Sequence, residues 1–343
     1  MRRCIDIAEQ GIGYVAPNPA VGAVIVYQNR IIGEGYHQKH GQPHAEPNAI
    51  NNVLPQHKHL LGQSTLYVSL EPCAHYGKTP PCANLIVETG IPKVVIACPD
   101  PFELVNGKGI ALLQAAGIEV TTGILQPEAE WLIRRFVTYH QQKRPYIVLK
   151  WAQTADHFFA PHNKQQRWIS NSFTQIVTHR WRTEEQAIIV GTNTALNDNP
   201  QLTARLWAGK QPLRLVIDRH LRLPQHLHLF TDGVAPTVVF TQVSAPKISH
   251  PQVRYVSIDF EKEPLPQILA YLYEQKIQSV IVEGGAALLN SFIARNLWDE
   301  ARVFTAPLYW HQGVAAPILG SAKLLQKQKI GDNYLNIFVN LQK

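Results

Sequence analysis

A histidine, a glutamate and two cysteines lie at spacings that suit a hydrolytic metal site. One residue separates His44 from Glu46, Cys73 follows Pro72, and Cys82 comes nine positions after Cys73. One imidazole and two thiolates give zinc three ligands and leave the fourth tetrahedral position to water. Zinc lowers the pKa of a bound water to about 7, so that hydroxide is available at neutral pH. The spacing therefore predicts zinc bound by His44, Cys73 and Cys82.

Glu46 stands where such a site needs a proton carrier. Positions i and i+2 of a helix diverge by about 200°, so Glu46 would point at the bound water instead of chelating beside His44. A carboxylate there takes the proton of the water and passes it to a ring nitrogen and a departing amine. Nucleobase deaminases use this order of residues, although eight residues instead of two separate Cys73 and Cys82 here. The predicted reaction is deamination, with Glu46 as its catalytic residue.

Other kinds of zinc site stay open. A structural site needs a fourth protein ligand, and His75 is the obvious one. A non-catalytic regulator needs no proton carrier, so the presence of Glu46 disfavours it. Cys73 directly follows an expected strand and is expected to open a helix, whose N-terminus would favour its thiolate.

The composition is that of an ordinary globular chain with two domains. At 343 residues the chain exceeds what one core usually serves. No long apolar run and no secretory signal is visible, so we expect no membrane span and a cytoplasmic protein. The net charge of +7 suits a small phosphorylated substrate. It would also suit nucleic acid, but no basic stripe interleaved with aromatic residues supports that interpretation.

Strands and helices alternate in both halves, which predicts two α/β domains. Residues 1–140 form the first domain, the polar segment 141–145 is the linker, and residues 146–343 form the second. Expected elements near the site are strands 21–27 and 30–36, joined by a hairpin at Gln28-Asn29, and a strand over 65–70. A helix from His44 and a helix over 82–90 ended by Gly90 are also expected. In the second half we expect strands 146–152, 187–191, 213–218, 237–241 and 279–285, and helices over 171–183, over 265–275 and from Ala286.

Longer motifs around these residues resemble the bifunctional riboflavin-biosynthesis deaminase–reductase family. They are PNPAVG (17–22), GEGYH (33–37), HAE (44–46) and EPCAHYGKTPPC (71–82), which includes the long cysteine spacing. The resemblance covers essentially the whole chain. It implies an N-terminal, cytidine-deaminase-like three-layer α/β/α domain that deaminates 2,5-diamino-6-ribosylamino-4(3H)-pyrimidinone 5′-phosphate. It also implies a C-terminal, dihydrofolate-reductase-like α/β domain that uses NADPH to reduce the ribosyl group to ribityl, giving 5-amino-6-(5-phosphoribitylamino)uracil.

By the same resemblance, the pyrimidine and phosphate site of the first domain is lined by Asn18, His37, His75 and Lys78. The chemistry agrees, because Asn18 can donate and accept at a pyrimidine edge and Lys78 can meet a phosphate. Judged without the resemblance, His37 is more simply a surface histidine beside Lys39. A homo-oligomer is also expected, and the apolar segment NIFVNL (336–341) would be either its interface or an edge of the sheet.

In the second half, a strand ends in Glu283-Gly284-Gly285 and a helix follows at once, which would let the backbone approach a pyrophosphate. The resemblance assigns the cofactor to Ala152, Trp168, Thr194, Asp198, Gly285, Ala286, Ala287, Leu288, Leu289, Asn290 and Ser291. It assigns the substrate to Arg182, Leu202, Arg205 and Glu283, with the two arginines on the phosphate. Judged by the residues alone, Arg182 would be on a solvated helix face and Trp168 in the core.

The active-site turn of the second half departs from the family pattern. His157 stands where the family has a glycine, and a positive φ there costs a histidine more. A deaminase with a decayed reductase half therefore remains an alternative. A nucleic-acid base deaminase is another, which the long insert between the cysteines disfavours. For proton delivery during the reduction, Asp156 and Glu283 are equal candidates.

Overall fold

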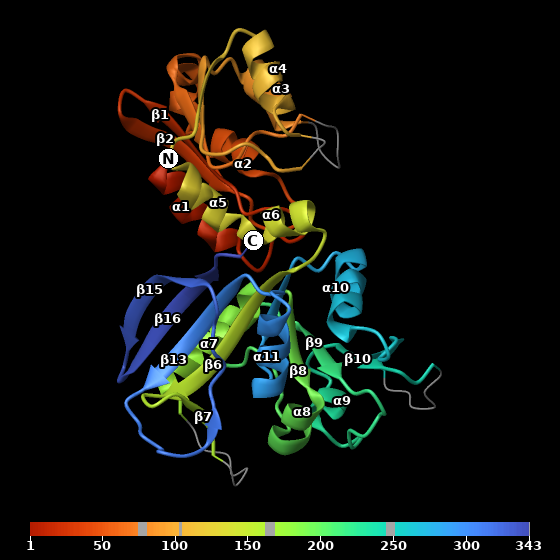
Figure 1. Cartoon of the computed structure of the whole chain (residues 1–343). Coiled ribbons are helices and arrows are strands. Elements are labelled where there is room, and N and C mark those ends of the chain that lie inside the picture. Colours follow the sequence, from red (N-terminus) through yellow and green to blue (C-terminus); the bar gives the residue numbers. More distant parts are fainter. Residues whose placement is uncertain (75–80, 103–104, 162–168, 245–250, 343) are drawn as a thin grey trace. The chain divides into compact units, whose positions relative to one another are not determined.

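The chain folds into two compact units, Met1–Lys143 and Arg144–Lys343 (Figure 1). The computed structural model describes residues 1–74, 81–102, 105–161, 169–244 and 251–342. No helix among those residues is both long enough and apolar enough to cross a membrane. Helix α6 runs on to Gln142, two residues into the segment predicted as a linker. Each unit is described on its own below.

The N-terminal unit is built on a five-stranded sheet with the order β2-β1-β3-β4-β5. Strands β1 and β2 are antiparallel, as are β1 and β3, whereas β3, β4 and β5 are parallel. The strands are β1 (Gly22–Tyr27), β2 (Arg30–Tyr36), β3 (Thr65–Val68), β4 (Lys93–Ile96) and β5 (Glu119–Thr122). The helices are α1 (Arg2–Ala8), α2 (Ala45–Asn51), α3 (Cys82–Thr89), α4 (Lys108–Ala115), α5 (Gln126–Leu132) and α6 (Arg134–Gln142), with 3-10 turns at Glu9–Gly11 and Pro55–Gln63.

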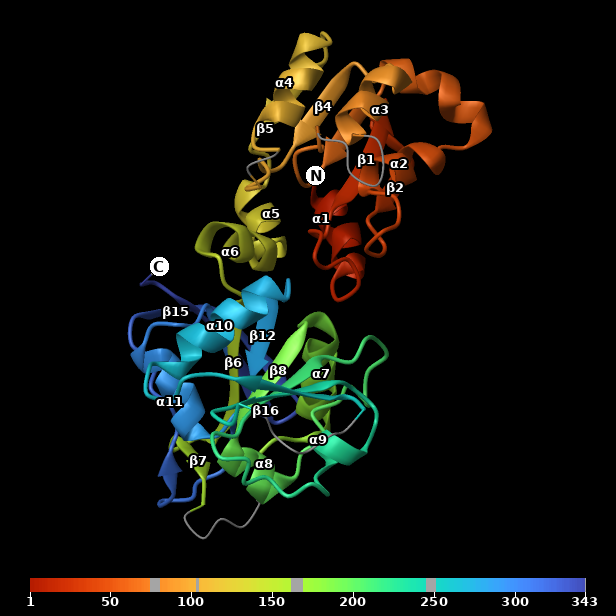
Figure 2. The same cartoon turned by 90° about the vertical axis from the view of Figure 1, so that its right-hand side faces the viewer.

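Helices cover both faces of this sheet, which confirms the predicted α/β class (Figure 2). Successive side chains of a strand point to opposite faces, so each strand contributes to two cores. In β1, Ala23 and Ile25 pack with the residues of α2 and α3, whereas Val24 packs with Cys4 and Ile7 of α1. The result is three layers, with the predicted metal ligands on the side of α2 and α3.

Backbone details fix where α2 lies on the sheet. The predicted hairpin between β1 and β2 turns at Gln28 and Asn29, and both residues have a positive φ. Strand β2 then carries glycine where α2 crosses it, because a Cβ on Gly35 would lie 2.4 Å from the backbone nitrogen of Ala49. This direct backbone approach holds the N-terminus of α2, and with it His44, against the end of β2.

The C-terminal unit is built on a nine-stranded sheet with the order β11-β10-β9-β8-β12-β6-β13-β16-β15. It is parallel from β11 to β13, and β16 and β15 are added antiparallel. The strands are β6 (Tyr146–Thr154), β8 (Ala187–Gly191), β9 (Leu213–Ile217), β10 (Thr237–Thr241), β11 (Val253–Ser257), β12 (Ser279–Val282), β13 (Glu300–Ala306), β15 (Ala322–Ile330) and β16 (Asn333–Asn340), and a small separate sheet pairs β7 (Phe158–Ala160) with β14 (Val314–Ala315).

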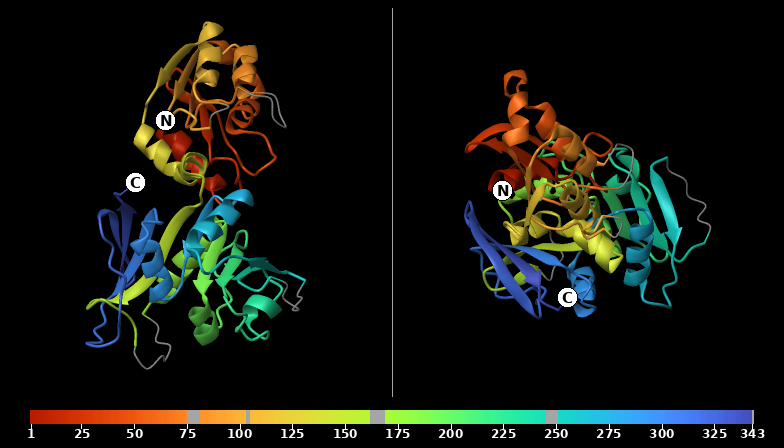
Figure 3. Two further views of the ribbon diagram at one scale, coloured as in Figure 1. Left: turned by 45° about the vertical axis from the view of Figure 1, so that its right-hand side comes forward. Right: turned by 90° about the horizontal axis from the view of Figure 1, so that it is seen from above.

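Helices again cover both faces, so that the sheet separates two cores (Figure 3). The helices are α7 (Ser172–Glu184), α8 (Thr192–Asp198), α9 (His228–Thr231), α10 (Pro264–Glu274) and α11 (Ala286–Ala294). The segment 336–341 falls largely in β16, which lies between β13 and β15. The expectation that it forms an edge is therefore wrong, since the edge strand is β15.

Candidate active sites

The predicted metal ligands lie together. One donor atom each from His44, Cys73 and Cys82 falls within 4.8 Å of the others. His44 Nδ1 is 3.4 Å from Cys82 Sγ and 3.8 Å from Cys73 Sγ. Zinc bonds of about 2.0 Å to nitrogen and about 2.3 Å to sulfur, at a tetrahedral angle, would put the nitrogen and the sulfur about 3.5 Å apart. The three residues therefore fit a zinc ion with a fourth position open.

Three different elements supply the ligands. His44 is the N-cap of α2, Cys82 is the first residue of α3, and Cys73 lies in the irregular segment after β3. The prediction that Cys73 opens a helix is wrong, because Cys73 has no regular secondary structure and α3 begins at Cys82. Cys73 is still stabilised by that helix, since its Sγ accepts the backbone N–H of Cys82 at 3.3 Å. His75, the alternative fourth ligand, and Lys78 lie outside the described residues.

The ligand cluster favours a thiolate. Hydrogen bonding from the Cys82 thiol and from His44 lowers the pKa of Cys73 to about 4. The same shared proton and burial raise the pKa of Cys82, and the hydrogen bond to Cys73 raises the pKa of His44. The hydrogen bonds within the cluster thus favour the ionised form of Cys73. Zinc binding then displaces the remaining proton, because a metal ligand must be deprotonated.

Glu46 lies in the first turn of α2 and is 3% exposed. Burial is the main cause that raises the pKa of Glu46 above its ordinary value, and the charge of Cys73 adds to it. A carboxyl with a raised pKa both accepts and returns a proton near neutral pH. The side chain therefore has the protonation behaviour that the predicted proton carrier needs.

A second buried carboxylate, that of Glu71, was missed by the sequence reasoning and fixes the segment that carries Cys73. Glu71 is 3% exposed, and its oxygens accept backbone N–H groups from four residues. Oε2 accepts from Asp100 at 3.2 Å and Gly107 at 2.9 Å, and Oε1 accepts from Gly109 at 2.9 Å and Ile110 at 3.3 Å. The N-terminus of α4 and the preceding loop are thereby tied to the residue two positions before Cys73.

Asn18 and His37, both predicted to bind substrate, contact each other beside the metal cluster. Asn18 Nδ2 is 3.1 Å from His37 Nε2, and His37 Nδ1 is 3.0 Å from the carbonyl oxygen of Pro43. The His37 ring meets the His44 ring edge-on, with 5.2 Å between centroids. His37 is 2% exposed, so the reading of His37 as a surface histidine is wrong. Burial lowers the pKa of His37, which keeps Nε2 free to accept from Asn18.

In the C-terminal unit, Glu283 and Arg182 form a paired, bidentate contact. Nε and Nη2 of Arg182 each donate to Glu283 at 2.8 Å, and Nη1 donates to the carbonyl oxygen of Thr203 at 2.9 Å. Burial acts to raise the pKa of Glu283, but the charges of Arg182 and Lys150 outweigh it and lower that pKa to about 2. Arg182 is thus not on a solvated helix face. It links two other predicted substrate-site segments.

Lys150 belongs to this cluster and was also missed by the sequence reasoning. Its Nζ lies 3.7 Å from Glu283 Oε2, and burial lowers the pKa of Lys150. The signal was visible in the sequence, because Lys150 is the one charged residue in the strand segment YIVLKWA (146–152). A lysine in the middle of a strand that is otherwise buried needs a partner or a function.

Two of the predicted cofactor residues contact each other. Thr194 Oγ1 accepts the backbone N–H of Gly285 at 2.9 Å, and Gly285 is the N-cap of α11. The helix N-terminus predicted to receive a pyrophosphate is therefore formed at the end of β12. The side chain of Leu289 is fully buried in the core, so only the backbone of that residue can face a ligand.

The remaining reductase residues are placed as follows. Arg205 is exposed, and its Nη1 is 3.5 Å from Thr203 Oγ1, whereas Leu202 is buried with a φ of 53°. Asp198 ends α8, and burial raises its pKa. Ala152 is half-buried in β6, and Trp168 lies outside the described residues. Among the described residues, no hydrogen bond or ion pair joins the side chains of Ala152, Asp198, Leu202 and Arg205 to one another.

The turn after β6 has the conformation that the sequence suggested. His157 adopts a φ of 62°, and Nδ1 of its ring is 3.0 Å from the Gln153 side-chain nitrogen. Asp156 accepts the Thr154 hydroxyl at 2.6 Å and backbone N–H groups of Trp310 and His311. The carboxylate of Asp156 therefore holds two loops together, and its role in proton delivery stays a prediction.

Comparisons with known proteins agree with a deaminase domain followed by a reductase domain. Residues 1–98 match the cytidine and deoxycytidylate deaminase zinc-binding region, and residues 145–329 match the RibD C-terminal domain. A riboflavin biosynthesis protein RibD from Bacillus amyloliquefaciens is 39% identical over 335 residues, which is 96% of this chain and 89% of that protein. The chain belongs to the RibD family. A RibD protein is a bifunctional deaminase and reductase of riboflavin biosynthesis, so the predicted activities are confirmed.

Solved RibD structures share the fold over almost the whole chain. A deaminase/reductase from Thermotoga maritima is 36% identical, with a TM-score of 0.91 over 99% of this chain and 97% of that one. Acinetobacter baumannii RibD is 33% identical, with a TM-score of 0.87 over 99% of this chain and 98% of that one. The predicted family and the zinc-binding nature of the N-terminal RibD domain are thus confirmed. The roles of individual residues remain predictions.

Proposed function

We propose that the N-terminal unit removes an exocyclic amine from the pyrimidine of 2,5-diamino-6-ribosylamino-4(3H)-pyrimidinone 5′-phosphate. The Thermotoga relative is named a diaminohydroxyphosphoribosylaminopyrimidine deaminase, which supports this substrate. The observation that carries the proposal is the set of His44, Cys73 and Cys82 donor atoms at tetrahedral spacing with buried Glu46 beside it. When bound, zinc supplies the Lewis acidity that makes a water molecule nucleophilic at neutral pH.

The protein residues then have distinct tasks. Glu46 would take the proton of the attacking water and give it to the ring nitrogen. It would then take the proton of the newly formed hydroxyl and give it to the amine, which departs as ammonia while the carbonyl forms. Asn18 presents an amide to the pyrimidine edge, and its contact with His37 orients that amide. Lys78 would meet the phosphate, and His75 would line the same wall of the site. The pair of Asn18 and His37 is therefore expected to affect substrate binding more than zinc binding.

The C-terminal unit is proposed to reduce the ribosyl group to ribityl with NADPH. When bound, NADPH supplies the hydride. Gly285, Ala286 and Ala287 at the N-terminus of α11 would face its pyrophosphate, with Thr194 holding Gly285 in place. The remaining cofactor residues, Ala152, Trp168, Asp198, Leu288, Leu289, Asn290 and Ser291, are kept as proposals on the strength of the family match.

The charged cluster would bind the substrate sugar and phosphate. Arg205, which is exposed, is the proposed phosphate ligand, and Leu202 flanks it. Glu283 is held ionised and would accept from ribose hydroxyls. Lys150, whose pKa burial lowers, is a better proton source near neutral pH than a solvated lysine, so we assign it the proton that the opening ring requires.

Removal of the Glu46 carboxylate tests the deaminase assignment. Glu46→Gln should retain zinc and lose ammonia release by at least ~100-fold, because proton transfer by a positioned group contributes about that much. Glu88→Gln, on an exposed position of α3, is the matched control and should keep both. Near-normal ammonia release from Glu46→Gln would overturn the assignment.

A cytoplasmic location and a homo-oligomeric state belong to the same proposal. The mass in solution tests the second. Light scattering at micromolar concentration would give a single-chain mass if the oligomer prediction is wrong.

A further inference from the structure

The segment 201–206 has no regular secondary structure and yet is held at most of its residues. Side chains from elsewhere bind its backbone at four positions. Arg214 Nη1 donates to the carbonyl of Gln201 at 3.2 Å and Arg182 Nη1 to that of Thr203 at 2.9 Å. Gln211 Oε1 accepts the N–H of Ala204 at 2.7 Å, and His179 Nδ1 accepts that of Leu206 at 3.3 Å.

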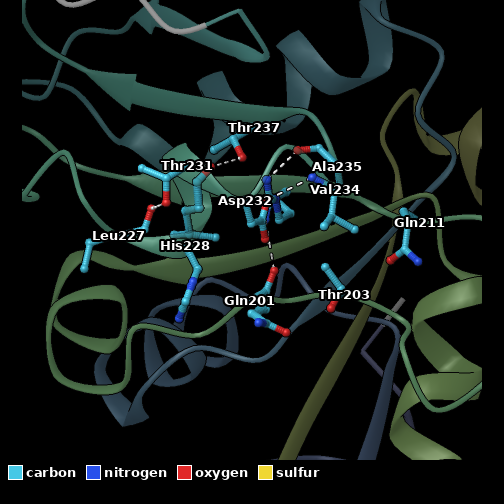
Figure 4. Close-up of polar contacts among 12 residues, drawn as sticks. Gln201, Thr203, Gln211, Leu227, His228, Thr231, Asp232, Val234, Ala235 and Thr237 are labelled. Atoms are coloured by element: carbon cyan, nitrogen blue, oxygen red, sulfur yellow. Dashed lines mark hydrogen bonds and ion pairs between the residues drawn. The ribbon is translucent and has the colours of Figure 1, made fainter.

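Arg214 is the buried residue that anchors this arrangement. It lies in β9, a strand within the nine-stranded sheet, and is 1% exposed. Besides Gln201 it donates to Asp232 Oδ2 at 2.7 Å and to the carbonyl of Ala235. Figure 4 shows that Gln201 comes from one stretch of chain and Asp232 and Ala235 from another, and that the three residues meet around one place. A single guanidinium therefore joins the substrate-site segment to the turn between α9 and β10.

Stability alone is a weak reason for this charge. Nε of Arg214 has no hydrogen-bond partner among the described residues, and an apolar side chain would fill a strand position in the core at lower cost. The segment that Arg214 holds also contains Leu202, a non-glycine residue with positive φ. Backbone held in such a conformation is typical of sites whose geometry matters for binding.

We propose that Arg214 is a positioning residue, which fixes segment 201–206 so that Arg205 is presented to the substrate phosphate. Arg182, Gln211 and His179 share this task at the other three points. Burial, together with the charges of Arg182 and Arg205, lowers the pKa of His179 to about 4, so its ring stays neutral and its Nδ1 stays an acceptor. The inference rests on the proposed phosphate role of Arg205.

The test compares reduction of the phosphorylated substrate with reduction of its dephosphorylated form. In Arg214→Met the KM for the phosphorylated substrate should rise roughly 10- to 100-fold, since displacement of a binding group by about 1 Å has effects of that size. The preference for phosphate should fall in parallel, and the KM for NADPH should stay unchanged. Arg254→Met, on exposed Arg254 of β11, is the control and should change none of these values.

A purely structural role gives a different pattern. A lowered melting temperature with the preference for phosphate intact would overturn the inference. If Arg214→Met does not fold, Gln211→Leu decides, because Gln211 is exposed and its loss frees only the backbone of Ala204. That variant should lower the preference several-fold, and an unchanged preference would overturn the inference.

Arg205→Ala, run in parallel, separates the two possible failures. If the Arg205→Ala variant keeps the preference for phosphate, the proposed role of Arg205 is wrong, and the positioning role of Arg214 is overturned as well. If Arg205→Ala abolishes the preference and the Arg214 and Gln211 variants keep it, only the positioning role is overturned.

Discussion

Replacement of Glu71 by glutamine isolates the effect of one buried charge on the zinc site. The carboxylate accepts four backbone N–H groups, two at each oxygen. Glutamine keeps one oxygen and turns an NH2 group toward the other two N–H donors. Two charge-assisted hydrogen bonds are then lost, and each contributes about 1.5 kcal/mol or more. The free energy of unfolding of the N-terminal unit should therefore fall by at least about 3 kcal/mol.

Part of that cost should appear in zinc affinity. Zinc binding requires Cys73 to hold one position, whereas the metal-free segment can relax after the anchor is lost. If half of the cost falls on the bound state, about 1.5 kcal/mol corresponds to roughly a 10-fold weaker zinc complex. Partners of metal ligands commonly contribute about 10- to 100-fold in affinity, which agrees with this value.

Competition with a chromophoric chelator measures the zinc affinity of Glu71→Gln directly. The cobalt-substituted protein gives a second reading, because the thiolate-to-cobalt absorption reports the placement of Cys73. Glu88→Gln is again the matched control. Melting of the metal-free and zinc-loaded forms completes the set. An unchanged zinc affinity and cobalt spectrum, with only a lower melting temperature, would show that Glu71 stabilises the fold in general and does not position Cys73 for zinc.

Three further predictions follow from the structure. X-ray absorption at the zinc edge should show two sulfur ligands at about 2.3 Å and nitrogen or oxygen ligands at about 2.0 Å, and a third sulfur would contradict the ligand set. Gly35→Ala should displace α2 and weaken zinc binding, because the new Cβ would lie 2.4 Å from Ala49 N, whereas Gly62→Ala, with 3.8 Å to its nearest atom, should not. The pKa of His179 is lowered to about 4, chiefly by burial, whereas histidine in the unfolded chain titrates near ~6.5, so the unfolded state binds more protons between these values. The C-terminal unit should therefore lose stability as the pH falls from about 6.5 toward 4, and His179→Gln should flatten that slope; equal slopes would show that His179 does not contribute.

The sequence predicted best what depends on local spacing. His44, Cys73 and Cys82 were predicted as ligands because zinc chemistry limits which residue types can share one ion. The turn at Gln28 and Asn29 was predicted from two short strands with a two-residue connection. Both predictions depend on residue types and short spacings and on few residues elsewhere in the chain, so a short stretch of sequence was enough to make them.

The sequence could not show which distant backbone groups a buried polar residue meets. Glu71 reads as part of a cysteine motif, but its partners lie 29 to 39 positions away, in a loop and in a helix N-terminus. Arg214 reads as one polar residue at the start of a strand, and only the folded chain brings Gln201, Asp232 and Ala235 around it. The expected helix at Cys73 failed for a related reason, since Cys73 lies in an irregular segment that Glu71 ties to backbone groups far along the chain.

One measurement tests the two-activity account most directly. Purified zinc-loaded protein is given the diaminopyrimidine ribotide, and ammonia release and NADPH oxidation are recorded separately in the same sample. We expect ammonia release without added NADPH, followed by NADPH oxidation in a 1:1 ratio to ammonia when the cofactor is supplied. Ammonia release with no NADPH oxidation would contradict a working reductase, and no ammonia release from zinc-loaded protein would contradict the deaminase assignment.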